Sequence, residues 1–157
     1  MEHVIGIGEW FISKNIEDTI KTYALASCVA VTAYSKSGHV AGMIHIALPE
    51  KKNFMETNSE KRGYFAKSGI PFLINQMEQK FDCKRSELKI CLYGGAISKK
   101  ENDVFKIGQK NLEMIQQTLG EMGLKCYKSD VGGVASRTID INVISGEVRV
   151  VYGEINI

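Results

Sequence analysis

The stretch that decides the fold is residues 27–48, which read SCVAVTAYSKSGHVAGMIHIAL. Two apolar runs, 27–34 and 39–48, flank the polar turn signal Ser35-Lys36-Ser37-Gly38, and Pro49 follows the second run. This pattern is typical of an antiparallel β-hairpin, because serine and glycine favour tight turns and proline ends a strand. We therefore expect the two runs to pair.

The register of this hairpin determines how Cys28 and His45 lie relative to each other. A four-residue turn over residues 35–38 places Cys28 directly opposite His45, whereas a tighter turn centred on Ser37-Gly38 leaves the two residues diagonal. In both registers the thiol and the imidazole share one face of the sheet. The other face is apolar and is a credible core face, made of Val29, Val31, Ala33, Val40, Gly42, Ile44 and Ile46.

A thiol and an imidazole on one face can act as nucleophile and base, but spacing alone leaves a second interpretation open. Buried cysteines are common, and a histidine in a strand often only satisfies a backbone carbonyl. If the pair is catalytic, we expect the Cys28 sulfur to lie within about 4 Å of a ring nitrogen of His45.

The composition is that of an ordinary globular protein. A chain of 157 residues with 44% hydrophobic residues fits one domain over 1–157, with a core that needs neither disulfides nor a structural metal. No apolar run approaches the length of a membrane span, and residues 1–6 lack the features of a signal peptide, so we expect a cytoplasmic protein without membrane insertion. The net charge of +2, with lysines and acids interspersed, argues against nucleic-acid binding.

The four cysteines show no zinc or disulfide spacing, and we expect three of them to be small buried hydrophobes: Cys83, Cys91 and Cys126.

The rest of the chain predicts a mixed architecture. Two helices are expected, over 62–81 with an interruption at Gly69-Ile70-Pro71, and over 107–122. Residues 15–21 fit either a helical turn or a strand, and 50–59 is expected to be a mobile loop that could cover a site. Further strands are expected within 4–13 and at 88–93, 124–129, 138–144 and 147–152. The predicted fold is a single-domain α/β sandwich with a mixed, largely antiparallel sheet.

Two glycine pairs, Gly94-Gly95 and Gly132-Gly133, fit tight turns better than a nucleotide-binding loop, because they lack the spacing of that fingerprint. Asp130 and Arg137 bracket the second pair. They could form a buried ion pair that shapes the loop, or they could bind a substrate carbonyl, and the structural role is the better interpretation.

Several short motifs follow one another in an informative order. They are Thr22-Tyr23-Ala24-Leu25-Ala26-Ser27-Cys28-Val29, His45-Ile46-Ala47-Leu48-Pro49, Gly94-Gly95-Ala96, Ile107-Gly108-Gln109-Lys110-Asn111, and Asp130-Val131-Gly132-Gly133 with Arg137. This order resembles the chemoreceptor glutamine deamidase family CheD, and the resemblance covers nearly the whole chain.

The resemblance implies a fold related to the catalytic domains of deamidating toxins and the conversion of selected chemoreceptor glutamines to glutamate. It also implies a complex with a CheC-type phosphatase of the response regulator, and no metal or organic cofactor. Carried over by residue, the nucleophile falls on Cys28, the base on His45 and the third polar residue on Thr22. The family usually has Gly-Leu-Gly-Ser-Cys before the nucleophile, whereas this chain has Ala24-Leu25-Ala26-Ser27-Cys28, so a positive φ or a close substrate approach there would be impaired.

The residue types predict a mechanism. Neutral His45 takes the thiol proton, Cys28 attacks the amide carbon, and water then hydrolyses the thioester. Thr22 would orient the imidazole, and backbone N–H groups near Ser27 and Cys28 are the candidates for contacting the substrate oxyanion. A neighbouring histidine should also stabilise the thiolate, so we expect Cys28 to be alkylated faster near neutral pH than Cys83, Cys91 and Cys126. The alternative is an adaptor with weak or lost catalysis that binds the phosphatase or receptors, and a cysteine peptidase or transglutaminase is a more distant possibility.

Overall fold

The central hairpin pairs β4 (Val29–Ser35) with β5 (Val40–Ile46). The computed structural model describes residues 1–52, 61–97 and 106–155. Ala30 lies opposite His45, which is the register of the tighter turn and leaves Cys28 diagonal to His45. Every residue of both strands is buried, so the hairpin is covered on its two faces.

The described strands form two sheets. The five-stranded sheet has the order β2-β5-β4-β6-β7, with β2 at Trp10–Ser13, β6 at Lys89–Gly94 and β7 at Cys126–Val131. The four-stranded sheet has the order β1-β3-β8-β9, with strands at Glu2–Val4, Thr19–Leu25, Ala135–Asn142 and Val148–Glu154. The pairs β1·β3 and β6·β7 are parallel and the other pairs are antiparallel, as expected for a mixed, largely antiparallel arrangement.

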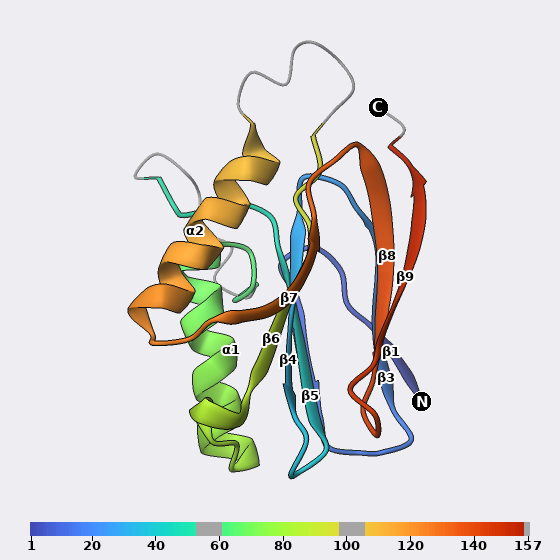
Figure 1. The fold of residues 1–157 in the computed structure, drawn as a ribbon, viewed down its shortest axis with the longest axis vertical. Coiled ribbons are helices and arrows are strands. Elements are labelled where there is room, and N and C mark those ends of the chain that lie inside the picture. Colours follow the sequence, from blue (N-terminus) through green and yellow to red (C-terminus); the bar gives the residue numbers. More distant parts are fainter. Residues whose placement is uncertain (53–60, 98–105, 156–157) are drawn as a thin grey trace.

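The molecule has three layers (Figure 1). Helices α1 (Ala66–Phe81) and α2 (Ile107–Glu121) cover one face of the five-stranded sheet, and the four-stranded sheet covers the other. One core lies between the helices and the five-stranded sheet and is called the helix-side core. It contains the apolar hairpin face predicted from the sequence, including Val31 and Ile44. A second core lies between the sheets and includes Ile20, Met43 and Ile139. The α/β sandwich is therefore confirmed, with its strands divided between two stacked sheets.

The first helix differs from its prediction, because α1 continues through Pro71 instead of breaking at Gly69-Ile70-Pro71. Pro71 removes only the hydrogen bond that its nitrogen would donate to the carbonyl of Lys67. The neighbouring residues Ile70, Leu73 and Ile74 are buried in the helix-side core, and their packing outweighs that loss. A short 3₁₀ helix, η1 (Arg85–Glu87), follows α1.

The remaining predictions are mostly confirmed. Of the ambiguous residues 15–21, the first four form a turn in which the Asp18 N–H donates to the Asn15 carbonyl at 2.9 Å, and the rest begin β3. The second helix lies where it was expected. The strand predicted at 124–129 begins and ends two residues later. Of the three cysteines expected to be buried, only Cys83 is fully so, while Cys91 and Cys126 are half-buried. Most of the loop expected at 50–59 lies outside the described residues.

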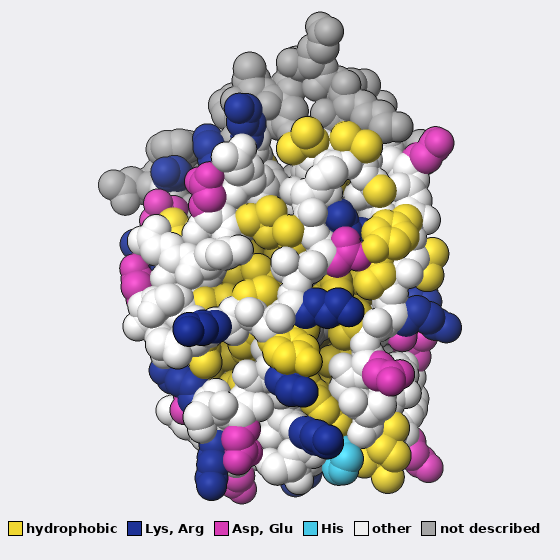
Figure 2. Space-filling model, in the orientation of Figure 1, with side chains coloured by type: hydrophobic (Ala, Val, Ile, Leu, Met, Phe, Trp, Pro, Cys, Tyr) yellow, Lys and Arg dark blue, Asp and Glu magenta, His cyan; other side chains and the backbone are white. Residues whose placement is uncertain are grey.

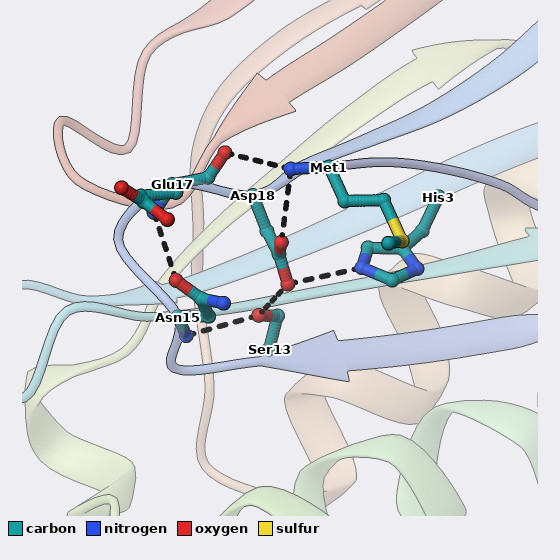
Figure 3. Close-up of polar contacts among 6 residues, drawn as sticks. All are labelled: Met1, His3, Ser13, Asn15, Glu17 and Asp18. Atoms are coloured by element: carbon teal, nitrogen blue, oxygen red, sulfur yellow. Dashed lines mark hydrogen bonds and ion pairs between the residues drawn. The ribbon is translucent and has the colours of Figure 1, made fainter.

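A polar network around Asp18 fixes β1 beside β3 (Figure 3). The Asp18 carboxylate accepts hydrogen bonds from the Ser13 hydroxyl at 2.7 Å and contacts His3 Nε2 at 3.0 Å. It also pairs with the amino group of Met1 at 3.3 Å. The Ser13 hydrogen bond contributes most to holding the pKa of Asp18 below its usual value. Ile5 follows β1 directly, and its N–H donates to the Lys21 carbonyl at 2.9 Å, which holds in place a residue whose carbonyl the candidate site uses.

The surface carries charges of both signs. Figure 2 shows basic and acidic side chains interspersed with apolar ones over the face seen in Figure 1. Among the described helices, none has the length and apolar character needed to cross a membrane.

Candidate active site

The candidate nucleophile, Cys28, lies in the short connection between β3 and β4. Three successive carbonyls of this connection accept hydrogen bonds from other parts of the chain. Ala96 N–H donates to the Ala26 carbonyl at 2.7 Å, and Gly95 N–H donates to the Cys28 carbonyl at 2.9 Å. The Asn111 side-chain amide donates to the Ser27 carbonyl at 2.9 Å. The backbone around Cys28 is therefore fixed at every residue, although the connection is not part of a strand.

The Gly94-Gly95 pair is required by this arrangement. Gly94 has φ +109° and Gly95 has φ +63°, conformations that side chains rarely adopt. A Cβ atom at Gly94 would overlap the Cys28 carbonyl oxygen, so only glycine allows this close approach. The second pair packs on the first, since Gly132 N–H donates to the Gly94 carbonyl at 2.9 Å. The glycines thus serve as structural turns, as predicted, and their role is to support the Cys28 connection.

The candidate base, His45, is 3% exposed and extends from β5 between the two sheets. Its Nδ1 atom lies 2.7 Å from the Thr22 hydroxyl oxygen. The Thr22 hydroxyl donates its only hydrogen to the Ile5 carbonyl at 2.8 Å. Thr22 can therefore only accept from the imidazole, so Nδ1 carries the ring hydrogen and Nε2 keeps its lone pair. This is the tautomer that a general base needs, and the predicted neighbourhood of Thr22 and His45 is confirmed.

Burial controls the charge of the imidazole. It lowers the pKa of His45 to about 4, and the negative charge of Glu9 opposes this shift only in part. His45 is therefore neutral near pH 7 and can accept a proton.

Cys28 lies on the same side of the hairpin as His45. Its side chain is half-buried and packs against the inter-sheet core, which also contains Ala30, the residue opposite His45. Burial raises the pKa of the Cys28 thiol. A raised pKa disfavours the thiolate form of Cys28 in the resting protein, and the faster alkylation expected of Cys28 stays a prediction.

The predicted contact between the Cys28 sulfur and His45 is not formed as a hydrogen bond. The Nε2 atom of His45 is buried and has no hydrogen-bond partner among the described residues. The resting pair is consequently a neutral thiol and a neutral imidazole, and proton transfer must accompany the attack on a substrate.

Asp130 and Arg137 form the ion pair favoured from the sequence. Arg137 is buried, and its Nε atom lies 3.2 Å from Asp130 Oδ1. Tyr152 donates its hydroxyl hydrogen to the other carboxylate oxygen. Because Asp130 precedes Gly132-Gly133, this cluster shapes the loop that packs on Gly94.

The two alanines before Ser27 differ in their backbone conformation. Ala24 has φ +52°, in the left-handed region that favours glycine, while Ala26 is not in that region. The strain expected from replacing a glycine is therefore confined to Ala24. Its N–H donates to the Thr138 hydroxyl at 2.9 Å, at an irregularity in the pairing of β3 with β8.

Two features of the site carry no signal that a single sequence could reveal. The Ile5 carbonyl belongs to a chain segment with no chemical motif, yet it determines the tautomer of His45 through Thr22. Asn111 stands in a motif quoted above, but only the fold brings it to the Cys28 connection. Among the described residues, no group of three or more His, Cys, Asp or Glu side chains could hold a metal ion.

Several known proteins are similar to this chain along most of its length. The profile of the family described as CheD chemotactic sensory transduction matches residues 47–152. A probable chemoreceptor glutamine deamidase CheD from Syntrophotalea carbinolica is 39% identical over 94% of this chain and 91% of the relative. The chemoreceptor glutamine deamidase CheD of Thermotoga maritima is 32% identical over 96% of this chain and 91% of the relative.

A solved structure shares the fold at low sequence identity. The Bacillus licheniformis hypothetical protein YfiH superimposes with a TM-score of 0.50 at 12% identity, over 83% of this chain and 58% of that protein. At this identity the likeness concerns the fold alone. The family profile and the relatives, which match along most of the sequence, show that this chain belongs to the CheD family.

Proposed function

We propose that this protein hydrolyses the side-chain amide of selected chemoreceptor glutamines to glutamate and ammonia, with Cys28 as nucleophile and His45 as base. The observation that carries the proposal is the chain of contacts from the Ile5 carbonyl through Thr22 to His45 Nδ1, which leaves Nε2 basic. The relatives named chemoreceptor glutamine deamidases provide the substrate class. The reaction takes place in the cytoplasm, on the receptor helices that reach it.

The first half of the reaction forms a thioester. His45 Nε2 takes the thiol proton as the Cys28 sulfur attacks the glutamine carbonyl carbon, which gives a tetrahedral intermediate. The protonated imidazole then donates this proton to the amide nitrogen as the carbon–nitrogen bond breaks, so ammonia leaves. The imidazole is neutral again after this step.

The second half releases the product. His45 takes a proton from water as the water oxygen attacks the thioester carbon, and it returns the proton to the departing Cys28 sulfur. The products are a glutamate side chain and the original thiol. Thr22 stabilises the imidazolium that forms in each half by accepting a hydrogen bond from Nδ1–H, and it adds no charge of its own.

The oxyanion of each tetrahedral intermediate needs hydrogen-bond donors. The carbonyls of Ala26, Ser27 and Cys28 all accept bonds from within the protein. The backbone N–H groups at Ser27 and Cys28 are our candidates for the oxyanion donors, and Ser27 is in this way a substrate-binding residue. Such donors typically contribute about 3 kcal/mol each to stabilising the transition state.

The proposal is tested by incubating the protein with a purified receptor cytoplasmic domain and mapping glutamate at former glutamines by mass spectrometry. Cys28→Ser should lower the rate by orders of magnitude, because a serine beside a neutral histidine is a poor nucleophile. Cys91→Ser, a half-buried cysteine outside the site, is the matched control and should retain activity. Loss of activity in both variants, or retention in both, would contradict the assignment of Cys28.

The same variants separate the enzyme from an adaptor. A CheC-type phosphatase is the proposed partner, and it should bind Cys28→Ser as tightly as the unaltered protein, since one sulfur-to-oxygen change leaves the surface intact. If the unaltered protein binds the phosphatase but converts no receptor glutamine, the adaptor function replaces the enzymatic one. Two observations favour this alternative, because both would weaken catalysis: the left-handed backbone at Ala24 and the raised pKa of Cys28.

A further inference from the structure

Asn111 bridges the two segments that carry the proposed nucleophile and base. It lies on α2, is 0% exposed, and its Nδ2 atom donates to the Ser27 carbonyl at 2.9 Å and to the Ala47 carbonyl at 3.1 Å. Ser27 directly precedes Cys28, and Ala47 follows His45 by two residues. A single side-chain amide therefore connects both segments to one point on the helix.

The chemistry of its neighbours fixes the orientation of this amide. Two carbonyl oxygens can only accept hydrogen bonds, so the NH₂ group must face them and Oδ1 must point away. The Oδ1 atom is buried and has no hydrogen-bond partner among the described residues. A buried acceptor without a partner destabilises the folded state. Packing alone would therefore favour an apolar residue here, and the two donated bonds are what distinguishes asparagine.

The helix that carries Asn111 is itself held against the Cys28 connection. Gly108, one turn earlier on the same face of α2, lies so close to the 94–96 segment that a Cβ atom would be 2.7 Å from the Gly95 carbonyl oxygen. Gly95 and Ala96 in turn donate to the carbonyls of Cys28 and Ala26. The start of α2 and the 94–96 segment thus form one rigid support beneath the nucleophile.

We propose that Asn111 is a positioning residue, which sets the alignment of the Cys28 sulfur with His45 Nε2; this inference rests on the proposed function. The two side chains form no hydrogen bond at rest, so the frequency of productive encounters depends on how firmly their backbones are held. Misplacement of a reacting group by about 1 Å can lower a rate by about a hundredfold. Asn111 contacts neither the thiol nor the imidazole and acts through the backbone of their neighbours.

The first test compares two variants of α2 in the glutamine deamidation assay. Asn111→Leu removes the donor while filling the space, and Thr118→Val, seven residues further along the same buried face, removes a polar group away from the site. Asn111→Leu should lower kcat by about tenfold to a hundredfold with KM changed by less than about threefold. Thr118→Val should leave both within about twofold. A loss confined to KM, or equal losses in the two variants, would overturn the proposal.

Folding is measured for every variant by urea denaturation, and Asn111→Ala provides a second substitution. A kcat loss in a variant that unfolds at the same urea concentration as Thr118→Val supports the positioning role. If neither Asn111 variant folds, Asn111 is a structural residue and the proposal is wrong.

A second test needs no receptor substrate. The alkylation rate of Cys28 by iodoacetamide is measured by peptide mass spectrometry, with buried Cys83 as the internal reference. When Asn111 is kept, His45→Gln should slow Cys28 alkylation. When Asn111→Leu is already present, adding His45→Gln should not slow Cys28 alkylation further. An equal slowing in both backgrounds overturns the positioning role and leaves the proposed function intact. No slowing in the unaltered protein contradicts His45 as the base, and with it both proposals.

Discussion

Acidification should destabilise this protein through His45. The folded protein buries the imidazole, and burial lowers its pKa to about 4 from an ordinary value of 6.5. The unfolded chain therefore binds a proton at His45 more readily than the folded chain does. The stability that neutral His45 contributes is fully present above about pH 6.5. It falls as the pH drops toward about 4, where the folded form also becomes protonated.

The size of this effect follows from the two pKa values. Each pH unit between them changes the free energy of unfolding by at most about 1.4 kcal/mol. The protein should lose about 1 kcal/mol at about pH 5.5 and about 2 kcal/mol at about pH 4.5, relative to neutral pH. Asp18, whose pKa is also lowered, contributes a further loss at more acidic pH.

The assay is urea unfolding of the unaltered protein and of His45→Gln at a series of pH values. Glutamine does not titrate, so the difference between the two proteins isolates His45 and cancels Asp18 and the other carboxyl groups. NMR titration of the His45 ring provides a direct check. A parallel pH dependence of the two proteins, or a His45 ring that titrates near pH 6.5, would refute the argument from burial.

Five other substitutions test the site. Thr22→Val should lower kcat by at least about tenfold, because the imidazole loses the acceptor that fixes its tautomer. Thr22→Ser keeps the hydroxyl and should restore most of the rate. Equal rates in the two variants would exclude the hydroxyl from this role. Ala24→Gly should raise the free energy of unfolding by about 0.5–1 kcal/mol by relieving a left-handed alanine, whereas Ala26→Gly should not, and chemical denaturation compares them. Gly94→Ala should lower both stability and deamidation, because its Cβ would displace the Cys28 carbonyl; a fully active variant would show that the Cys28 connection tolerates movement.

The sequence by itself determined the local structure and the identity of the reactive groups. The alternation of apolar residues in 27–48 predicted the hairpin and its helix-side face, since a strand places alternate residues on opposite faces. Short-range signals also located the second helix and the later strands. Cys28, His45 and Thr22 could be selected because a nucleophile, a base and an orienting hydroxyl are recognisable by residue type and motif order.

Local signals failed where packing decided the outcome. Pro71 predicted a break in the first helix, but burial of its neighbours in the helix-side core maintains the helix. The sequence also gave no basis for choosing between the two hairpin registers. That choice depends on strand pairing across the whole sheet, and pairing with β2 and β6 on either side fixes it.

Only the tertiary structure decided the chemical state of the site. Thr22, on β3 of the four-stranded sheet, contacts His45 Nδ1 and donates its hydroxyl hydrogen to the Ile5 carbonyl, and these two contacts assign the ring hydrogen to Nδ1. The same burial makes the imidazole neutral and raises the pKa of Cys28. Asn111 reaches the Cys28 connection from a position 84 residues away from Ser27. Protonation and alignment depend on groups that are distant in the chain, and no local pattern encodes which of them will meet.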